Sequence, residues 1–158
     1  MKVRLAKEDD ARDAVALLKQ SIIELCVEDH KNDENTISDW VRNKTVETWV
    51  SWVRNPAAMV YVCVSERDIV GVCMMNNGGE ILLNYVHPEM RFQGVSKNML
   101  NAMEADAFRL GLRSCTLEST RTAKSFYEAR GYEAHGYSSE AGEVAALKLR
   151  KNLLVQNN

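Results

Sequence analysis

The segment of the sequence best suited to chemistry is a turn that leads into a long helix. An apolar strand over residues 81–86 is followed by Pro88 and then by a helix with Gly94 near its start. The free N–H groups and the positive dipole end of a helix N-terminus attract anions, and a glycine there lets a phosphate approach the backbone closely. Arg91 and Lys97 add positive charge at the same point. The pattern therefore predicts a phosphate-binding site at the start of this helix.

The cysteines and histidines do not indicate a metal site. The cysteines are Cys26, Cys63, Cys73 and Cys115, and they are scattered without a CxxC pair. The three histidines do not complete a zinc-type spacing with them. We expect reduced, mostly buried thiols and no metal.

Charge and hydropathy exclude several classes of function. The net charge is −2 and the pI is about 5.9, which argues against binding to nucleic acid. No apolar stretch is long enough to span a membrane, and the amino terminus lacks the features of a secretory signal, so we expect a cytoplasmic protein. Residues 24–47 hold seven acidic side chains against three basic ones. This run is either a solvated helix face or an acidic surface that attracts a cationic amine.

The periodicity of apolar residues predicts the elements that position these groups. The 158 residues have the size of one domain, so we expect a single domain over residues 1–158. Strands are expected over residues 2–6, 59–65, 69–75, 80–86, 114–118, 132–137 and 143–149. Helices are expected from about residue 10 to 25, as two short segments within 36–55, and over 91–110 and 122–130. This order predicts an α/β (α+β) fold with a mixed sheet and helices on both faces.

Two motifs in this framework resemble those of the GNAT superfamily of N-acyltransferases. The sequence from Val86 to Ser96, VHPEMRFQGVS, is similar to the pyrophosphate-binding motif Q/R-x-x-G-x-G/A, with Ser96 where Gly or Ala is usual. The sequence from Leu117 to Tyr132 is similar to the later signature A-x-x-F-Y-x-x-x-G-F/Y. The resemblance extends over nearly the whole chain and includes features of a bacterial small-molecule-type branch.

The resemblance implies a fold and a cosubstrate. The GNAT fold has a mixed, mostly antiparallel sheet of about six or seven strands, which is splayed at the coenzyme site and has helices on both faces. The implied activity is that of an acetyl-CoA-dependent N-acetyltransferase, in which an amine attacks acetyl-CoA directly through a tetrahedral intermediate, without a metal. The implied coenzyme-binding residues are Tyr85, Val86, His87, Arg91, Phe92, Gln93, Gly94, Val95, Ser96 and Thr120. Backbone groups of residues 85–87 would bind the pantetheine arm, and the N–H groups of residues 91–96 would bind the pyrophosphate.

The implied reaction requires two proton transfers. An amine with a pKa of about 10 arrives protonated, so a base must remove a proton. Glu80, at the start of the splayed strand, is the first candidate and would act through water, while Glu118 on the neighbouring strand is the second. The departing CoA thiolate needs a proton, and the resemblance implies that Tyr127 is the general acid.

The acceptor and the assembly remain open. The acidic run favours a small cationic amine, and a peptide N-terminus or lysine side chain is the runner-up. The length of the acyl chain is not fixed by any residue, and a homodimer is implied by the resemblance alone. A different class of function is a non-catalytic CoA-binding protein, either a regulator or a partner subunit. Exposure of the tryptophan-rich segment 36–52 would favour the partner subunit.

Overall fold

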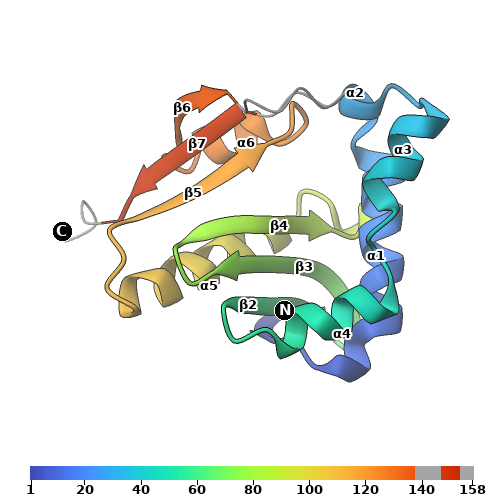
Figure 1. Cartoon of the computed structure of the whole chain (residues 1–158), viewed down its shortest axis with the longest axis horizontal. Coiled ribbons are helices and arrows are strands. Elements are labelled where there is room, and N and C mark those ends of the chain that lie inside the picture. Colours follow the sequence, from blue (N-terminus) through green and yellow to red (C-terminus); the bar gives the residue numbers. More distant parts are fainter. Residues whose placement is uncertain (138–146, 154–158) are drawn as a thin grey trace.

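A computed structural model describes residues 1–137 and 147–153 (Figure 1). The strands are β1 (Lys2–Leu5), β2 (Ala58–Ser65), β3 (Asp68–Asn76), β4 (Glu80–Val86), β5 (Ser114–Ser119), β6 (Glu133–Tyr137) and β7 (Leu147–Asn152). The helices are α1 (Ala11–Leu25), α2 (Val27–His30), α3 (Glu34–Val41), α4 (Val46–Arg54), α5 (Val95–Arg109) and α6 (Lys124–Glu128), with 3-10 turns at Glu8–Asp10 and Pro88–Met90. Over these residues, no helix has both the length and the apolar character needed to cross a bilayer.

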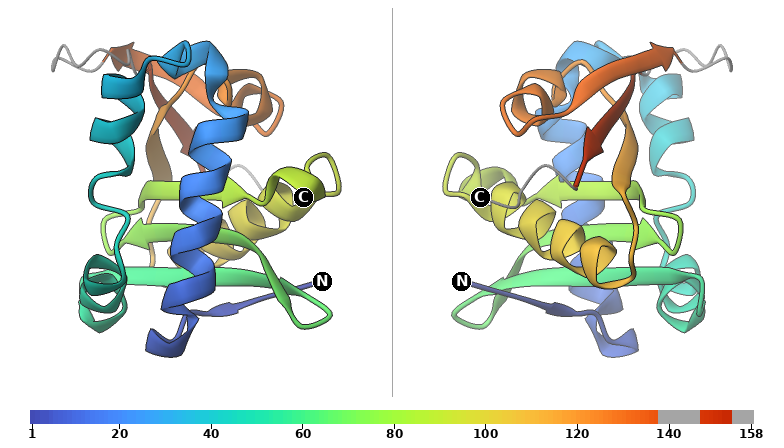
Figure 2. Two further views of the ribbon diagram at one scale, coloured as in Figure 1. Left: turned by 90° about the vertical axis from the view of Figure 1, so that its right-hand side faces the viewer. Right: turned by 90° about the vertical axis from the view of Figure 1, so that its left-hand side faces the viewer.

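The strands form one seven-stranded sheet in the order β1-β2-β3-β4-β5-β7-β6. Neighbouring strands are antiparallel except β4 and β5, which are parallel. The mixed, mostly antiparallel sheet predicted from the sequence is therefore confirmed. The two panels of Figure 2 show that β5 and β7 cross the direction of β2–β4 at a steep angle.

Helices cover both faces of the sheet. Because successive strand residues point to opposite faces, Val62 and Val72 pack toward α1 and α4, whereas Cys63 and Cys73 pack toward α5. Figure 1 shows α4 in front of the sheet, α5 behind it, and α3 beside α1 at the right-hand end of the strands. Trp49 of α4 is fully buried in the core that contains Val62 and Val72, on the α1 side of the sheet. Its Nε1 donates a hydrogen bond to the Lys7 carbonyl at 3.0 Å.

The parallel pair β4–β5 is short and then diverges. The two strands are paired only where Glu80 lies opposite Thr116 and Ile81 lies opposite Leu117. Ile81 and Leu117 are buried in the α5-side core, which fixes this end of the pair. Beyond them, the remaining residues of β4 have no strand partner on the β5 side, and a gap opens. The predicted splay of the sheet is present.

Two turn-to-helix boundaries differ from the sequence prediction. The helix expected from residue 91 begins at Val95, because Phe92 and Gly94 have φ values of 65° and 84°, outside the right-handed helical region. The helix expected over 122–130 is confined to Lys124–Glu128. Residues 143–146 of the last predicted strand lie outside the described residues, and β7 continues to Asn152.

The tryptophan-rich segment forms two helices, as predicted, and a side chain caps the start of each one. The Asp33 carboxylate accepts a hydrogen bond from the Thr36 N–H at 2.9 Å, and the Thr45 hydroxyl accepts one from the Thr48 N–H at 3.1 Å. Such caps satisfy N–H groups that have no partner inside the helix. They fix the starts of α3 and α4.

A buried polar network connects α5 to the far half of the sheet. The carboxylate of Glu104 accepts hydrogen bonds from the Tyr132 hydroxyl at 2.9 Å and from the Lys151 ammonium at 2.8 Å. The Glu104 side chain is only 8% exposed and that of Lys151 is 18% exposed. Burial raises the pKa of Tyr132, and the neighbouring Glu104 raises it further, so this phenol stays protonated and donates.

We predict that Glu104→Ala lowers the free energy of unfolding by about 2–4 kcal/mol, because it leaves a largely buried ammonium and a buried phenol without their acceptor. Urea denaturation measures the loss. Glu8→Ala is the control, since it breaks the exposed Arg54–Glu8 ion pair and is expected to change the midpoint little. Equal effects of the two changes would contradict the stabilising role of the network.

Candidate functional site

The gap between β4 and β5 contains a cavity of about 620 Å³. It extends from the start of α5 to the side chains of α6, and residues of α1 line it as well. The predicted site residues that line it are Tyr85, Val86, Arg91, Phe92, Gly94, Val95, Ser96, Thr120 and Tyr127. Segments far apart in the sequence therefore meet around one cavity.

Three predicted residues do not line this cavity. Glu80 lies at the closed end of the gap, where its Oε1 accepts a hydrogen bond from the Asn76 side chain at 3.2 Å. The His87 ring caps the 3-10 turn, with Nδ1 accepting from the Glu89 N–H at 3.1 Å. Gln93 is exposed.

β4 turns the backbone of alternate residues toward the gap. The His87 N–H donates to a β3 carbonyl at 2.8 Å, and Tyr85 lies two residues earlier in the same register. Because hydrogen-bonded residues alternate along an antiparallel pair, Asn84 and Val86 direct their N–H and C=O groups away from β3. Of the residues 85–87 expected to bind through their backbones, Val86 is thus the one whose groups face the gap.

The start of α5 forms a cationic end of the cavity. Gly94 is the N-cap residue in the left-handed conformation, and a Cβ built on it would meet no atom within 4 Å. The Arg91 guanidinium lies 4.6 Å from the centre of the Phe92 ring, and this ring is 89% exposed. Lys97 also lines the cavity. Free N–H groups, two cations and open space at the glycine together suit a phosphate group.

Tyr127 of α6 also lines the cavity. Its ring packs edge-on against Phe126 and Tyr132, with centroid distances of 5.1 and 5.6 Å. Burial raises the pKa of Tyr127, and an interaction with the Asn84 side chain partly offsets the increase. The phenol is therefore neutral near pH 7 and is able to donate its proton.

The two candidate carboxylates differ in their access to the cavity. Glu118 lines the cavity and is exposed, whereas Glu80 does not line it. Glu118 is close to the end of β5, where the gap is open, while Glu80 belongs to the short paired stretch. A carboxylate that lines the cavity can accept a proton from a ligand or from water.

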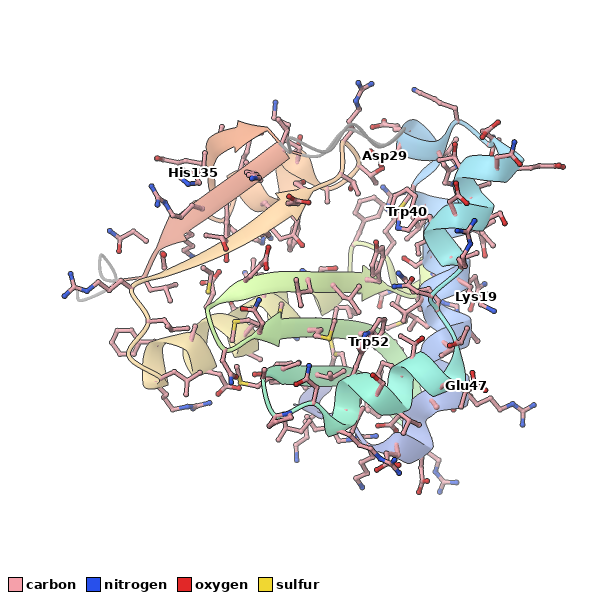
Figure 3. All side chains as sticks on the ribbon, viewed as in Figure 1. Lys19, Asp29, Trp40, Glu47, Trp52 and His135 are labelled. Carbon is pink, nitrogen blue, oxygen red and sulfur yellow. The ribbon has the colours of Figure 1, made fainter. Side chains whose placement is uncertain are left out.

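Asp29 of α2 joins the first helices to the loop between β5 and α6. Its carboxylate accepts hydrogen bonds from the N–H of Arg121 at 2.7 Å, from the N–H of Thr122 at 3.2 Å and from the Thr122 hydroxyl. Trp40 of α3 lies nearby in Figure 3, and its Nε1 donates to the Tyr85 hydroxyl at 3.3 Å. These contacts close the wide end of the gap.

Two cavity residues, Asn84 and Arg130, and the nearby Asp29 were not singled out as site residues from the sequence. Asn84 was visible as one polar residue inside the apolar strand ILLNYV. Arg130 lines the cavity, with its guanidinium 4.5 Å from the Phe126 ring centre. Asp29 lay within the acidic run, but no local pattern reveals a contact with residues more than 90 positions away.

All four cysteines are buried, and one of them lines the cavity. Burial raises the pKa of the Cys26 thiol to about 12, with a contribution from Asp29. Such a thiol is not a nucleophile near pH 7. Among the described residues, no group of three or more histidine, cysteine or acidic side chains is placed to hold a metal ion.

Comparisons with known proteins identify the relatives of this chain. The family model described as "Acetyltransferase (GNAT) domain" matches residues 26–153. A GCN5-related N-acetyltransferase structure from Rhodopseudomonas palustris is 22% identical, with a TM-score of 0.84 over 96% of this chain and 94% of that one. A PaiA N-acetyltransferase from Thermoplasma acidophilum, in complex with coenzyme A, is 17% identical, with a TM-score of 0.82 over 96% and 98%.

A further similar structure is an aminoglycoside 6'-N-acetyltransferase complexed with coenzyme A. It is 13% identical, with a TM-score of 0.70 over 98% of both chains. At these identities the structures show a shared fold. No curated protein sequence matches the chain.

Replacing Gly94 tests the anion site with a matched pair of variants. Asp and Asn are isosteric and both tolerate the left-handed conformation, so Gly94→Asp and Gly94→Asn differ mainly in charge. We expect the aspartate to weaken the binding of CoA by about tenfold more than the asparagine, since a carboxylate repels a pyrophosphate at the helix start. Calorimetric titration with CoA measures this difference, and circular dichroism verifies folding. Equal affinities would contradict the placement of the phosphates.

Proposed function

The chain belongs to the GNAT family of acetyltransferases, and we propose that it is an N-acetyltransferase that transfers an acetyl group from acetyl-CoA to a primary amine. The observation that carries the proposal is the cavity between β4 and β5, whose lining combines a cationic helix start with a buried, protonated tyrosine. This combination suits a ligand that carries both phosphates and a reactive group. Two proteins of similar fold have structures in complex with coenzyme A, which supports the same ligand class here.

Thermal unfolding with acetyl-CoA tests the ligand. A ligand that binds the folded state raises the midpoint by mass action. We expect a rise with acetyl-CoA and CoA, and little change with ATP at the same concentration. No shift with either coenzyme would contradict the proposal.

An assay with labelled acetyl-CoA and a panel of amines then tests catalysis. Transfer of label to any amine separates an enzyme from a CoA-binding protein that does not turn over. Binding without transfer to small amines, peptide N-termini or lysine side chains would favour the non-catalytic alternative.

Different residues of this chain would bind the different parts of acetyl-CoA. Acetyl-CoA supplies the acetyl group as a thioester. The N–H groups at the start of α5, with Arg91, would bind the pyrophosphate, and the backbone of β4 would bind the pantetheine arm as an added strand. The Val86 N–H, which faces the gap, would donate to the thioester oxygen and stabilise the negative charge that develops on it.

Two side chains would carry out the proton transfers. Glu118 would accept a proton from the amine, directly or through water, so that the nitrogen can attack the thioester carbon. As the new C–N bond forms and the C–S bond breaks, Tyr127 would donate its proton to the departing sulfur. We favour Glu118 over Glu80 as the base because Glu118 lines the cavity and Glu80 does not.

We propose a small cationic amine as the acceptor. Glu118 at the cavity and the exposed acidic side chains of α2 and α3, such as Glu28 and Glu34, would attract a cation. Asp29 is already occupied by backbone hydrogen bonds and is not counted among them.

Tyr127→Phe is expected to lower kcat by about 10²-fold while the Kd for CoA changes little, because the change removes one proton donor and little volume. Steady-state kinetics and calorimetry measure the two quantities. A loss of affinity as large as the loss of turnover would contradict the role of general acid.

The same substitution at two carboxylates tests the base. Glu118→Gln is expected to lower kcat/KM by about 10²-fold or more, and Glu80→Gln, at the closed end of the gap, is expected to have a much smaller effect. The opposite order of the two variants would assign the base to Glu80.

A further inference from the structure

Arg130 is a cation at the cavity that the proposed mechanism does not use. It lies two residues beyond α6 and lines the cavity from the α6 side of the gap. Among the residues that the structure describes, its buried Nε atom has no hydrogen-bond partner and its side chain makes no ion pair. A guanidinium is always charged, so without an acidic neighbour it is available to an anionic ligand. Other arginines of the chain do contact carboxylates: Arg4, Arg42, Arg54 and Arg109.

The surrounding structure holds the Arg130 guanidinium in place. The Tyr127 carbonyl accepts hydrogen bonds from the Arg130 N–H at 3.0 Å and from the Tyr132 N–H at 3.1 Å, which fixes the backbone. Tyr132 is anchored in turn by its hydroxyl, which donates to Glu104 at 2.9 Å. The guanidinium carbon lies 4.5 Å from the centre of the Phe126 ring, a cation–π contact. Because the cation is positioned before a ligand arrives, binding an anion orders little further side-chain freedom.

The charges that line the cavity differ in balance from those of the whole chain. The cations Arg91, Lys97 and Arg130 line it. Among the described residues of this lining, only Glu118 is acidic. The chain as a whole has a net charge of −2. Positive charge is therefore concentrated at the cavity of a slightly acidic protein, which suits a ligand with several negative charges.

Coenzyme A carries more phosphate than the start of α5 accounts for. It has a pyrophosphate and, on the ribose, a separate 3′-phosphate. In the proposed function the N–H groups of α5 and Arg91 bind the pyrophosphate, and Arg130 belongs to the other side of the gap. A phosphate monoester has a charge of about −1.5 to −2 at pH 7 and three acceptor oxygens, which a guanidinium can bind through two parallel N–H groups.

We propose that Arg130 binds the 3′-phosphate of coenzyme A, and that this contact makes the protein select CoA over dephospho-CoA. The proposal rests on the proposed function, because it assigns a further part of the same coenzyme. The pyrophosphate and the 3′-phosphate would then be bound from opposite sides of the gap, by the start of α5 and by the chain after α6. The coenzyme would thereby connect the two halves of the splayed sheet at its nucleotide end.

Dephospho-CoA lacks only the 3′-phosphate, so it removes one partner of the contact while Arg130→Met removes the other. We expect the wild-type protein to bind CoA about tenfold more tightly than dephospho-CoA. Arg130→Met should weaken the binding of CoA by about the same factor and leave the Kd for dephospho-CoA within about twofold. Methionine keeps an unbranched side chain that can pack on the Phe126 ring. Calorimetric titration measures the four Kd values, and circular dichroism verifies folding. An equal loss for both ligands, or no loss for either, would overturn the proposal.

The same substitution at the other arginine of the cavity is the matched control. Arg91 stacks on Phe92 much as Arg130 stacks on Phe126, with a distance of 4.6 Å to the ring centre. We expect Arg91→Met to weaken the binding of CoA and of dephospho-CoA by the same factor, because both ligands carry the pyrophosphate. Loss of the preference for CoA in Arg91→Met, with the preference kept in Arg130→Met, would assign the 3′-phosphate to Arg91 and overturn the proposal.

A spectroscopic measurement on the wild-type protein tests the contact without any substitution. The 3′-phosphate is a monoester, so its ³¹P resonance is separate from those of the pyrophosphate. We expect binding to shift the monoester resonance as well as the pyrophosphate resonances, and an unshifted monoester resonance would overturn the proposal. A wild-type protein that binds no CoA at all would instead overturn the proposed function. Equal affinities of the wild-type protein for CoA and dephospho-CoA would overturn this inference alone.

Discussion

β4 and β5 run parallel and pair over only two residues, and the function of the molecule depends on what happens beyond that point. A strand that loses its neighbour keeps unpaired N–H and C=O groups along its edge, and these groups need other partners. At the closed end, Ile81 and Leu117 are buried together in an apolar core. At the open end, the strands separate enough for a cavity of about 620 Å³. The edge of β4 is thereby prepared to bind an extended chain.

The cavity carries features that do not favour the stability of the unliganded fold. Phe92, a non-glycine residue, has a positive φ value, and the side-chain amide of Asn84 is buried without a hydrogen-bond partner among the described residues. Phe92 also exposes most of its ring to solvent. Features of this kind concentrate at binding sites, where a ligand compensates for them. Their grouping around one cavity is physical support for a site there that does not depend on the motif.

The sequence predicted the helices and strands more accurately than it predicted which side chains reach the cavity. Alternating and helical periodicities placed the described strands within a few residues, since those periods report directly which side chains are buried. The start of α5 was placed four residues too early, because an amphipathic pattern does not reveal that Phe92 adopts a positive φ. Glu80 and Glu118 stand at opposite ends of their strands, and the parallel register decides which one meets the cavity. The hydrogen bond from the Arg121 N–H to Asp29 could not be predicted from the sequence either, because it depends on how distant segments pack together.

The proposed reaction needs groups from both sides of the splay at distances controlled to a few tenths of an ångström. Val86 and the start of α5 belong to one side, and Tyr127 and Glu118 belong to the other. The sides are joined by apolar packing at Ile81 at one end and by the carboxylate of Asp29 at the other. Water competes for hydrogen bonds at an exposed edge far more readily than it enters an apolar core. The separation of β4 from α6 therefore depends on both ends of the gap, the apolar packing at Ile81 and the hydrogen bonds of the Asp29 carboxylate to the loop before α6.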